Sequence, residues 1–501
     1  MNTSLVWYRQ DLRTHDHAPL RTAAGLDGKA NSDVPHQTFA VYCFDPREHG
    51  VTQFGFSRTG PHRTRFLLES VDNLRQALRR LGGELLIRWG HPEEVLPELI
   101  RATGAGHLHY HDAVGVDEES IADAVDSACR EIDCVAHRHP GQTLLDSQHL
   151  PFPPEQTPEL FTDFRRKVEK HFSVPDPLAE PNGLNGQLPE GLPPGELPTW
   201  DHLGLQPPAE DERALTPFRG GRSAGLARVH EYIWQQDCLR QYKQTRNGML
   251  RTNDSSKFSP WLAAGCLSAR TILKEIRRYE RERIKNDSTY WLIFELLWRD
   301  YFFFILRKHQ SKLFRRSGLR GLDLPWNTDR NSFHQWQIGE TGYPVVDANM
   351  QELLATGYLS NRGRQIVASF LTKNLGIDWR MGAEWFQSQL IDHDVASNWG
   401  NWNYSAGVGN DARGFRFFHP IKQAERYDPQ GEYVRHWLPV LQKVSDDAVH
   451  QPWIRGPQQQ KQEGCLLGRD YPEPMVDWEK SVQANEKAYQ QATRSAKKKR
   501  R

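Results

Sequence analysis

The spacing of apolar residues changes its period repeatedly over the first 140 positions, and this constrains the fold more than any other feature of the chain. Five short segments have the character of strands, and the stretches 63–81, 92–102 and 118–131 between them have helical spacing. Strands and helices in this order predict a parallel α/β sheet of Rossmann-like type. No Gly-x-Gly-x-x-Gly fingerprint follows the first expected strand. The expected strands are 5–8, 39–44, 84–88, 107–111 and 132–137.

A change of composition marks the end of this region. Residues 151–217 contain 14 of the 31 prolines, a density that interrupts helices and sheet ladders, and one helix is expected there at 157–171. From residue 218 onward the spacing is helical almost throughout, which predicts an all-α second domain. The expected organisation is an α/β domain over 1–140, a Pro-rich connector over 141–217, a helical domain over 218–480, and a basic, disordered tail over 481–501. The clearest expected helices are 225–242, 269–279, 288–310, 347–356, 362–375 and 383–389.

The net charge of +1 is a balance between two unlike parts. Residues 1–215 hold 20 Lys and Arg against 33 Asp and Glu, a net charge of −13, whereas residues 216–501 hold 44 against 30, a net charge of +14. Thirteen of the 16 tryptophans lie in the basic part. Cations neutralise phosphates and aromatic rings stack on bases, so this part suits nucleic acid. A salt-bridged surface over a tryptophan-rich core is the alternative.

The six cysteines are scattered without a Cys-x-x-Cys pair, and the N-terminus has no signal peptide. Both features favour a reducing compartment, so we expect a cytoplasmic protein, or a nuclear one if the source is eukaryotic. The longest apolar run, 290–306, contains Glu295, Arg299 and Asp300. Three charges within it argue against a membrane span and for a buried helix.

Three histidines, His107, His109 and His111, alternate along one expected strand and therefore share a face. Imidazoles in this arrangement could bind a metal ion, but the flanking sequence offers no matching cluster of carboxylates or cysteines. A structural role is favoured, and no metal site is predicted.

Several polar residues interrupt apolar helical surfaces and are candidates for a binding site. Glu295, Trp298 and Arg299 share one helix face, where a charge is costly unless it is paired or used. Asn361 and Arg364, together with Gln365, open a helix for which Ser360 is the expected N-cap. Such residues could cap the helix or line a polar cavity at its N-terminus.

Two further segments carry polar residues at close spacing. IDHDVASNWGNWNY (391–404) contains Asp392, Asp394 and Asn398, and it is expected to form a loop that lines a ligand. SSKFSPW (255–261) contains three serines that could hold phosphate or cap a helix. These serines are Ser255, Ser256 and Ser259.

Taken together, these segments resemble the photolyase/cryptochrome family, and within it the cryptochrome DASH branch. The resemblance runs from about residue 6 to residue 441, nearly the whole chain. Its most specific stretches include VWYRQDLRTHD (6–16), TGPHRTRFLLES (59–70), FRGGRSAGLARV (218–229), SSKFSPWLAAGCLS (255–268) and NWGNWNYSAGVGND (398–411). It implies an N-terminal α/β antenna domain, a connector and a helical domain that encloses FAD.

The resemblance also implies roles for individual residues around this cofactor. Positions matching those around the FAD phosphates and ribityl chain are Tyr242, Ser255, Ser256, Ser259 and Arg299. Positions matching those around the isoalloxazine ring are Asn361, Arg364, Asp392, Asp394 and Asn398, with Asn398 facing N5 and an ion pair between Arg364 and Asp392. A neutral amide near N5 can adjust to several redox states of the ring.

Three tryptophans, Trp402, Trp379 and Trp326, match the family's chain that passes electrons from the surface to the photoexcited flavin. Their separations of 23 and 53 residues are expected to place them on separate helices. The substrate pocket is implied in the same way: Glu295, Trp298, Gln365 and Tyr404 match positions that face a cyclobutane pyrimidine dimer in DNA photolyases. The implied activity is therefore that of a light-driven lyase for such dimers.

Two of these positions distinguish the DASH branch. Gln365 and Tyr404 stand where photolyases of duplex DNA commonly have Met and Trp. A more polar pocket with less stacking area offsets less of the cost of unpairing a base. The expected partner is thus single-stranded or looped DNA, with duplex DNA or RNA as alternatives, and the family implies a monomer. A blue-light photoreceptor that signals its redox state without repair is the alternative function.

The antenna chromophore is the point at which the sequence departs from the family. A Glu in the segment after the fourth strand commonly holds 5,10-methenyltetrahydrofolate, but Ala113 stands at that position, with Asp112 and Glu118 out of phase. A folate antenna, a different antenna and none are all open on the sequence.

Overall fold

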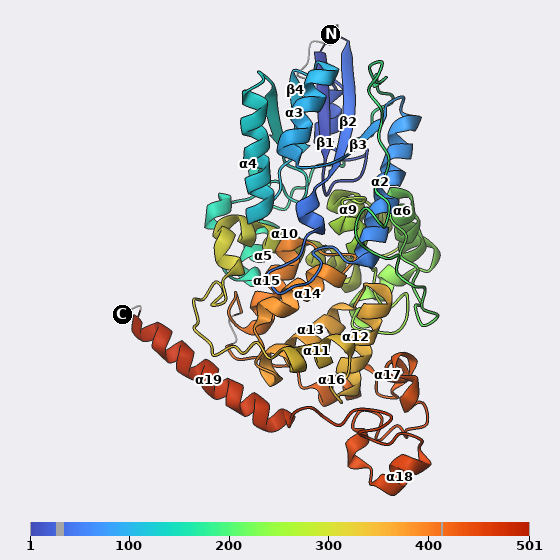
Figure 1. Ribbon diagram of the computed structural model, residues 1–501, viewed down its shortest axis with the longest axis vertical. Coiled ribbons are helices and arrows are strands. Elements are labelled where there is room, and N and C mark those ends of the chain that lie inside the picture. Colours follow the sequence, from blue (N-terminus) through green and yellow to red (C-terminus); the bar gives the residue numbers. More distant parts are fainter. Residues whose placement is uncertain (1, 27–34, 412–413, 500–501) are drawn as a thin grey trace.

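The computed structural model describes residues 2–26, 35–411 and 414–499, and it joins a small part containing a sheet to a larger helical part (Figure 1). Within these ranges five strands form one parallel sheet in the order β3-β2-β1-β4-β5. Leu5 of β1 is in register with Phe39 of β2 and Leu108 of β4. The strands are β1 (Asn2–Tyr8), β2 (His36–Phe44), β3 (Leu85–Trp89), β4 (His107–His111) and β5 (Val135–His139).

Helices cover both faces of this sheet, as a parallel sheet requires. Leu5 packs in one core with Leu99 of α3 and Val125 of α4, whereas its neighbour Val6 points to the opposite core with Leu74 of α2. The predicted α/β fold is confirmed. The helices of this part are α1 (Ala18–Ala23), α2 (Pro61–Arg80), α3 (Pro92–Thr103) and α4 (Val116–Arg130).

The edge strand β5 begins three residues later than expected, at Val135 rather than residue 132. After α4 ends, the chain turns through residues 131–133, where Asp133 has a φ of 57°. Cys134 is buried, and β5 follows it. A short apolar run next to a turn looks like a strand in the sequence, so the pattern alone misplaced this boundary.

The connector, residues 141–217, consists mostly of loops around one helix, α5 (Phe161–Glu169). This helix is shorter at both ends than the expected 157–171, because a 3-10 turn over Pro154–Gln156 ends at Thr157 and the chain becomes helical only after Leu160. Phe161 and Phe164 bury their rings in the core shared with the helical part. The connector therefore contributes to the wall of that core.

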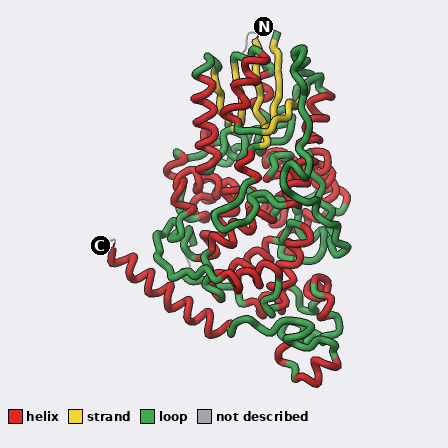
Figure 2. The backbone as a smooth tube through the Cα atoms, viewed as in Figure 1, coloured by secondary structure: helices red, strands yellow, loops and turns green. Residues whose placement is uncertain are grey.

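The rest of the chain is helical, and its described residues contain no strand beyond isolated bridges (Figure 2). The expected all-α domain is confirmed. Its α-helices are α6 (Arg222–His230), α7 (Tyr242–Thr245), α8 (Ser259–Ala263), α9 (Ala269–Glu282), α10 (Asp287–His309), α11 (Arg330–Ile338), α12 (Pro344–Thr356), α13 (Asn361–Ser369), α14 (Trp379–Gln389), α15 (Val395–Ala406), α16 (Pro420–Tyr427), α17 (Glu432–Trp437), α18 (Pro457–Gln462) and α19 (Trp478–Lys499).

Two expected helices are interrupted. The stretch 225–242 divides into α6, a π-helical turn over Glu231–Gln235 and a 3-10 turn over Cys238–Gln241, with Asp237 between the turns at a φ of 52°. The stretch 362–375 continues from α13 into a π-helical turn over Phe370–Asn374. Apolar spacing does not distinguish an α-turn from a wider π-turn, so the interruptions were not foreseen.

The prediction of a disordered tail over 481–501 is wrong for its described part. Residues up to Lys499 belong to α19, which packs against the π-helical turn Phe370–Asn374 and extends away from the body at the C-terminal end (Figure 1). Val482 and Tyr489 are buried, and Asn485 Nδ2 donates to the carbonyl oxygen of Lys373 at 3.0 Å. The apolar stripe anchors the helix, and the basic composition had concealed it.

The connector and the α/β part are both joined to the helical part by buried polar contacts as well as by a shared core. Asp300 of α10 is fully buried and accepts from the backbone N–H groups of Leu144 and Leu145, each at 2.9 Å. At another point the N–H of Gly60, which precedes α2, donates to the carbonyl oxygen of Ser388 at 2.8 Å. None of the helices in the described ranges is long and apolar enough to cross a bilayer.

Candidate FAD and substrate cavity

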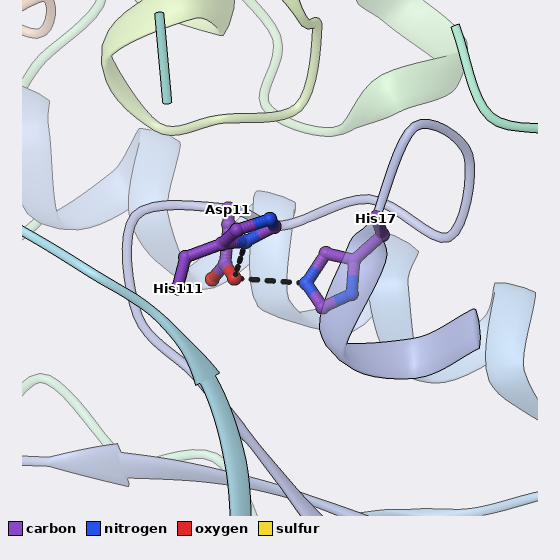
Figure 3. Close-up of side chains that lie close together, drawn as sticks. All are labelled: Asp11, His17 and His111. Atoms are coloured by element: carbon purple, nitrogen blue, oxygen red, sulfur yellow. Dashed lines mark hydrogen bonds and ion pairs between the residues drawn. The ribbon is translucent and has the colours of Figure 1, made fainter. Parts of the chain in front are cut away.

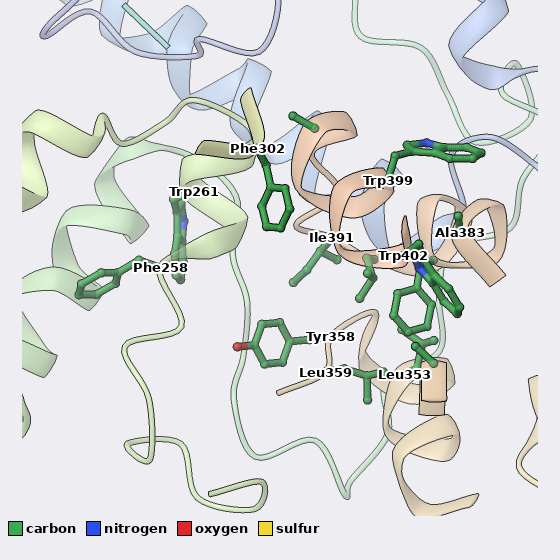
Figure 4. Packing of buried hydrophobic residues seen from close by; sticks show 14 of the residues in the cluster. Phe258, Trp261, Phe302, Leu353, Tyr358, Leu359, Ala383, Ile391, Trp399 and Trp402 are labelled. Carbon is green, nitrogen blue, oxygen red and sulfur yellow. The ribbon is translucent and has the colours of Figure 1, made fainter. Parts of the chain in front are cut away.

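Two adjoining voids of about 680 and 250 Å³ lie in the helical part and share Arg364, Asp392 and Asp394 as wall residues. We call them together the helical-domain cavity. Tyr358, Leu359 and Trp402 belong to the apolar packing around it (Figure 4). The predicted site residues that line this cavity are Tyr242, Ser255, Ser256, Ser259, Glu295, Trp298, Arg299, Asn361, Arg364, Gln365, Asp392, Asp394, Asn398, Trp402 and Tyr404.

One side of the cavity is lined by hydroxyl groups and a guanidinium. Ser255 and Ser256 precede α8, and Ser259 is its first residue. Arg299 of α10 lines the same cavity and donates to the carbonyl oxygens of Gln142 and of Leu262, a residue of α8. The side chains of this wall therefore offer hydrogen-bond donors, which suits a ligand with phosphate groups.

The other side is built on the first turns of two helices. Ser360 caps α13, because its hydroxyl accepts from the N–H of Gly363 at 3.0 Å, as the sequence predicted. Asp394 caps α15 by accepting from the N–H of Ser397 at 2.7 Å. The expectation of a loop over 391–404 is thus wrong beyond Asp394, since residues 395–406 are helical. Asp394 still lines the cavity while it caps the helix.

A buried ion pair joins these two helix starts. Arg364 Nη2 donates to Asp392 Oδ2 at 2.7 Å, and Ser259 Oγ donates to the same oxygen at 2.6 Å. The predicted Arg364–Asp392 pair is confirmed. Asn398 of α15 donates its Nδ2 to the carbonyl oxygen of Ala383 at 2.9 Å, which leaves its own carbonyl oxygen as the group to face the cavity.

Among the buried polar atoms of the cavity lining that lack a hydrogen-bond partner within the described protein are two acceptors, Asp392 Oδ1 and Gln365 Oε1. An unpartnered buried acceptor costs about 1–3 kcal/mol. A ligand with N–H or O–H donors would remove that cost. The hydroxyl-lined wall, the ion pair and the free acceptors together fit a large polar ligand such as FAD.

Glu295 of α10 forms no salt bridge with Arg299, which lies four residues later on the same helix face. Its carboxylate forms a salt bridge with Arg246, just after α7, and Arg246 also lines the cavity. Burial raises the pKa of the Glu295 carboxyl, and the guanidinium of Arg246 opposes that shift. The carboxylate is therefore held in place at the wall by a cation from another segment.

Trp298 is clamped by the connector. Its ring stacks on Phe161 of α5, with the centroids 3.7 Å apart and an interplanar angle of 13°. Phe302 lies on α10 one turn later, 5.5 Å from the Trp298 ring, and Tyr404 meets it edge-on at 6.4 Å. These contacts fix the indole at the cavity wall and leave little freedom to its rotamer.

The three predicted electron-transfer tryptophans occupy different depths. Trp402 is on α15 and lines the cavity, and fully buried Trp379 begins α14. Trp326 is half-buried in an extended segment before α11, so the expectation of three separate helices is wrong for this residue. Trp379 Nε1 donates to the carbonyl oxygen of Arg316 at 3.0 Å, and Arg316 Nη2 donates to that of Trp326 at 2.6 Å. Arg316 thus links the outer two.

Gly382 explains how Trp402 approaches the helix of Trp379. A Cβ atom at position 382 would lie 2.3 Å from Trp402 Cη2, closer than any real contact. The absence of a side chain at this point of α14 is what lets the Trp402 ring lie against the helix backbone. The close approach brings the cavity wall and the helix that begins at Trp379 together.

Sequence reasoning missed several residues of the cavity. Arg246, Lys257, Tyr358 and Arg416 all line it, and Lys257 is buried with a φ of 54°. They lie on four separate segments without a repeated spacing. Only the tertiary fold brings them to one place, so no single-sequence pattern could have selected them.

The residues that bear on a folate antenna lie in the loop after β4. Ala113 is buried there and has no side chain able to bind a ligand by hydrogen bonds. Of its neighbours, Asp112 forms a salt bridge with Arg307 of α10, and burial raises the pKa of Glu118 to about 7. The acids near Ala113 are therefore engaged elsewhere or held in an apolar setting.

Comparison with known proteins agrees with this geometry. Residues 291–491 match the family described as the FAD binding domain of DNA photolyase, and residues 4–182 match the family described as DNA photolyase. The helical part is therefore an FAD-binding domain of the photolyase type.

More detailed matches extend over almost the whole chain. A cryptochrome DASH from Gloeobacter violaceus is 56% identical over 490 residues, which cover 98% of this chain and 96% of the relative. The crystal structure of a Synechocystis cryptochrome superposes with a TM-score of 0.93 at 48% identity, covering 97% of this chain and 99% of the other. A class III photolyase from Agrobacterium tumefaciens has a TM-score of 0.84 at 29% identity, with 99% and 98% covered. The chain belongs to the cryptochrome DASH family.

Proposed function

We propose that this cryptochrome DASH repairs cyclobutane pyrimidine dimers in single-stranded or looped DNA under blue light, with FAD in the helical-domain cavity. One observation carries the proposal. The residues assigned to the dimer, Glu295, Trp298 and Gln365, open onto the same cavity as the Arg364–Asp392 pair assigned to the flavin. A bound dimer would thus lie directly beside the cofactor.

The chain's own residues would hold FAD from two sides. Ser255, Ser256 and Arg299 would donate to the phosphates, since this wall is rich in donors. Asp392 Oδ1 would accept from the ring, and the carbonyl oxygen of Asn398 would face N5. When bound, FAD supplies the light-driven one-electron chemistry, and the protein supplies position and electrostatics.

The tryptophans would conduct electrons inward from the surface. Trp402 is in the cavity wall, Trp379 begins the helix on which the Trp402 ring rests, and Trp326 is partly exposed. Arg316 links the outer two through their carbonyl and indole groups. Such a route would carry electrons from a reductant at the surface to bound FAD, so that no diffusible partner need enter the cavity.

The substrate side combines one carboxylate and one fixed ring. Photolyases take their target bases out of the stack, so the cavity must receive the dimer from outside the helix. Trp298, clamped by Phe161, would stack on the dimer, and Glu295 would contact its polar edge. Gln365 adds an unpartnered acceptor in place of apolar surface. Less stacking area offsets less unpairing cost, which favours DNA that is already unpaired.

Several guanidinium groups gather at and beside the wall of this cavity. Burial and the positive charges of Arg246, Arg416 and Arg426 lower the pKa of Arg362. Arg246 also lies 5.5 Å from the ring of Trp291, an aromatic residue of the cavity wall. A cluster of guanidinium groups beside aromatic rings suits a phosphate backbone with unstacked bases. We therefore expect affinity for single strands to fall steeply with salt.

The test is light-dependent repair of an oligonucleotide carrying one dimer, presented as a single strand, in a loop and in a duplex. Replacing Glu295 with Ala removes one contact to the dimer, and a hydrogen bond to a charged group contributes about 1.5–3 kcal/mol. Repair should fall roughly tenfold to a hundredfold. The matched control is Glu282→Gln, an exposed acid of α9 outside the cavity. Duplex repair as fast as single-strand repair would contradict the substrate preference.

A photoreceptor without repair is the second candidate, and the tryptophan route favours it equally, since photoreduction needs no DNA. The two functions differ in the role of Glu295. If signalling is the function, Glu295→Ala and the parent protein photoreduce alike and neither repairs dimers in any DNA form. Light-dependent repair by the parent protein excludes this reading.

A further inference from the structure

Four histidines of the α/β domain gather at one edge of the sheet, far from the residues of the proposed function. They are His107 and His109 of β4 and His137 and His139 of β5, and we call them the four-histidine cluster. His107 Nδ1 lies 3.1 Å from His137 Nε2, and His109 Nδ1 lies 3.0 Å from His139 Nε2. Two close imidazole pairs thus stand side by side.

The parallel register produces this arrangement. His109 is paired directly with His137, and their rings stack with centroids 4.6 Å apart and an interplanar angle of 10°. Alternate residues of a strand share one face, so His107, two residues before His109, and His139, two residues after His137, lie on the same side of the sheet. Each of them reaches diagonally to a ring of the other strand, which gives the two nitrogen pairs.

The cluster is accessible because β5 is the edge strand of the sheet. His109 is buried, with 4% of its surface exposed, whereas His107, His137 and His139 are half-buried. Helix α1 packs over this face and contacts both β4 and β5. A small ion could therefore reach the nitrogens from the open edge, while the sheet and α1 hold the rings in place.

The chemistry of the pairs is that of metal ligands. In an N–H···N contact one ring donates and the other presents a lone pair. A change of tautomer on the donor ring presents a second lone pair, without loss of a proton from the site. Imidazole nitrogens bind Zn²⁺ at about 2.0–2.1 Å, and two such nitrogens on one ion are then separated by roughly 2.9–3.4 Å. The observed separations of 3.0 and 3.1 Å lie within that span.

A neighbouring group of possible ligands has a different character. Asp11, His17 and His111 meet at the carboxyl ends of β1 and β4 (Figure 3). Both rings are hydrogen-bonded to one carboxylate oxygen, Asp11 Oδ2, at 2.8 Å for His17 Nε2 and 2.7 Å for His111 Nδ1. The buried guanidinium of Arg13 adds a positive charge that acts on both rings. This triad cross-links strand and helix ends through one shared carboxylate oxygen.

We propose that the four-histidine cluster binds a divalent transition-metal ion of the kind that imidazole prefers, Zn²⁺ or Cu²⁺. Each close nitrogen pair supplies two ligands, and water completes the coordination at the open edge. The site belongs to the sheet of the α/β domain and is independent of FAD and DNA. It revises the expectation from the sequence that no metal is bound.

The test uses the full-length, FAD-loaded protein after treatment with a chelator. Calorimetric titration with ZnCl₂ in the dark should show one or two ions per chain, and Cu²⁺ added in place of Zn²⁺ should give electron paramagnetic resonance with nitrogen hyperfine splitting. The variant His107→Gln/His137→Gln removes one pair, and His109→Gln/His139→Gln removes the other. Each double variant should weaken Zn²⁺ binding at least tenfold or lower the stoichiometry.

Glutamine keeps a hydrogen-bonding side chain at each position, so the variants should fold, and retained FAD absorbance checks this. The matched control, His171→Gln, removes an exposed histidine outside the cluster and should leave binding unchanged. The proposal is overturned if the parent protein binds no Zn²⁺, or if both double variants bind it as tightly as the parent. The pair His107→Gln/His137→Gln involves only half-buried rings, so it still tests the proposal if the other variant fails to fold.

Discussion

Replacing Asp392 with Asn tests the central polar contact of the helical-domain cavity. The carboxylate accepts at one oxygen from Arg364 at 2.7 Å and from Ser259 at 2.6 Å. Its side chain is 2% exposed, and that of Arg364 is 26% exposed. Asparagine has nearly the same shape, so the substitution removes the charge and one acceptor without opening a void. The effect can therefore be assigned to electrostatics and hydrogen bonding.

The expected magnitude follows from this geometry. Breaking a fully buried ion pair costs about 3–5 kcal/mol, because a charge remains without its partner. Arg364 is one quarter exposed, so water offsets part of that cost, and the asparagine oxygen keeps one hydrogen bond. We expect the free energy of unfolding to fall by about 2 kcal/mol. For a domain of this size that lowers the melting temperature by about 4 °C.

Cofactor affinity gives a second, separate readout. The unpartnered Asp392 Oδ1 is the atom proposed to accept from the flavin ring. Loss of a hydrogen bond to a charged group costs about 1.5–3 kcal/mol, so the dissociation constant of FAD should rise roughly tenfold to a hundredfold. Thermal unfolding of the FAD-free protein measures the first effect, and fluorescence titration with FAD measures the second.

A matched control separates the ion pair from the hydroxyl contact. Ser259→Ala removes a neutral donor and keeps the Arg364–Asp392 pair, so it measures the hydroxyl contact alone, about 1.5–3 kcal/mol for a hydrogen bond to a charged group. The double variant Asp392→Asn/Arg364→Gln should be less destabilised than the sum of its single variants, since the two residues are directly coupled. Unchanged melting temperature and unchanged FAD affinity in Asp392→Asn would refute the reasoning.

Three further predictions concern other parts of the fold. Trp402→Phe and Trp379→Phe should each slow photoreduction of bound FAD sharply at unchanged FAD content, and normal rates of bleaching in both would remove them from the electron route. Burial raises the pKa of Asp300 to about 7 in the folded protein. The unfolded chain loses the same proton near pH 4, so folding becomes less favourable as the pH rises from about 4 to 7. Asp300→Asn cannot titrate, so its melting temperature should improve relative to the parent between pH 5 and 7.5, and a constant difference would contradict the assignment. Tyr489→Ala should weaken the packing of α19 against the body of the protein by about 3–5 kcal/mol. Limited proteolysis should then cleave the C-terminal helix faster than in the parent protein.

Regular periodicity made the architecture predictable. The parallel sheet follows from strands of alternating or compact apolar residues, and β4 was expected with its observed bounds because its histidines alternate with buried Leu108 and Tyr110. Helix α10 was expected within one residue at each end, since its apolar run is long. Boundaries at turns were less accurate: β5 begins late because a left-handed residue, Asp133, precedes it.

Composition misled where packing decided the outcome. The charge of residues 481–501 predicted a disordered tail. The structure shows a helix as far as Lys499, which is anchored by the buried side chains of Val482 and Tyr489. The reverse holds at Asp394, where acidic and glycine residues suggested a loop but the side chain caps α15. In each case a contact with a distant segment or a local cap outweighs average propensity.

The sequence by itself determined the α/β and helical parts, the family resemblance and fifteen of the residues that line the cavity. Only the tertiary structure decided their partners: Glu295 pairs with Arg246 rather than Arg299, Trp298 stacks on Phe161, and the histidines of β4 meet those of β5. The reason is physical. Local spacing fixes the face on which a side chain lies, but the partner comes from another segment, and its position depends on how all the helices and strands pack together.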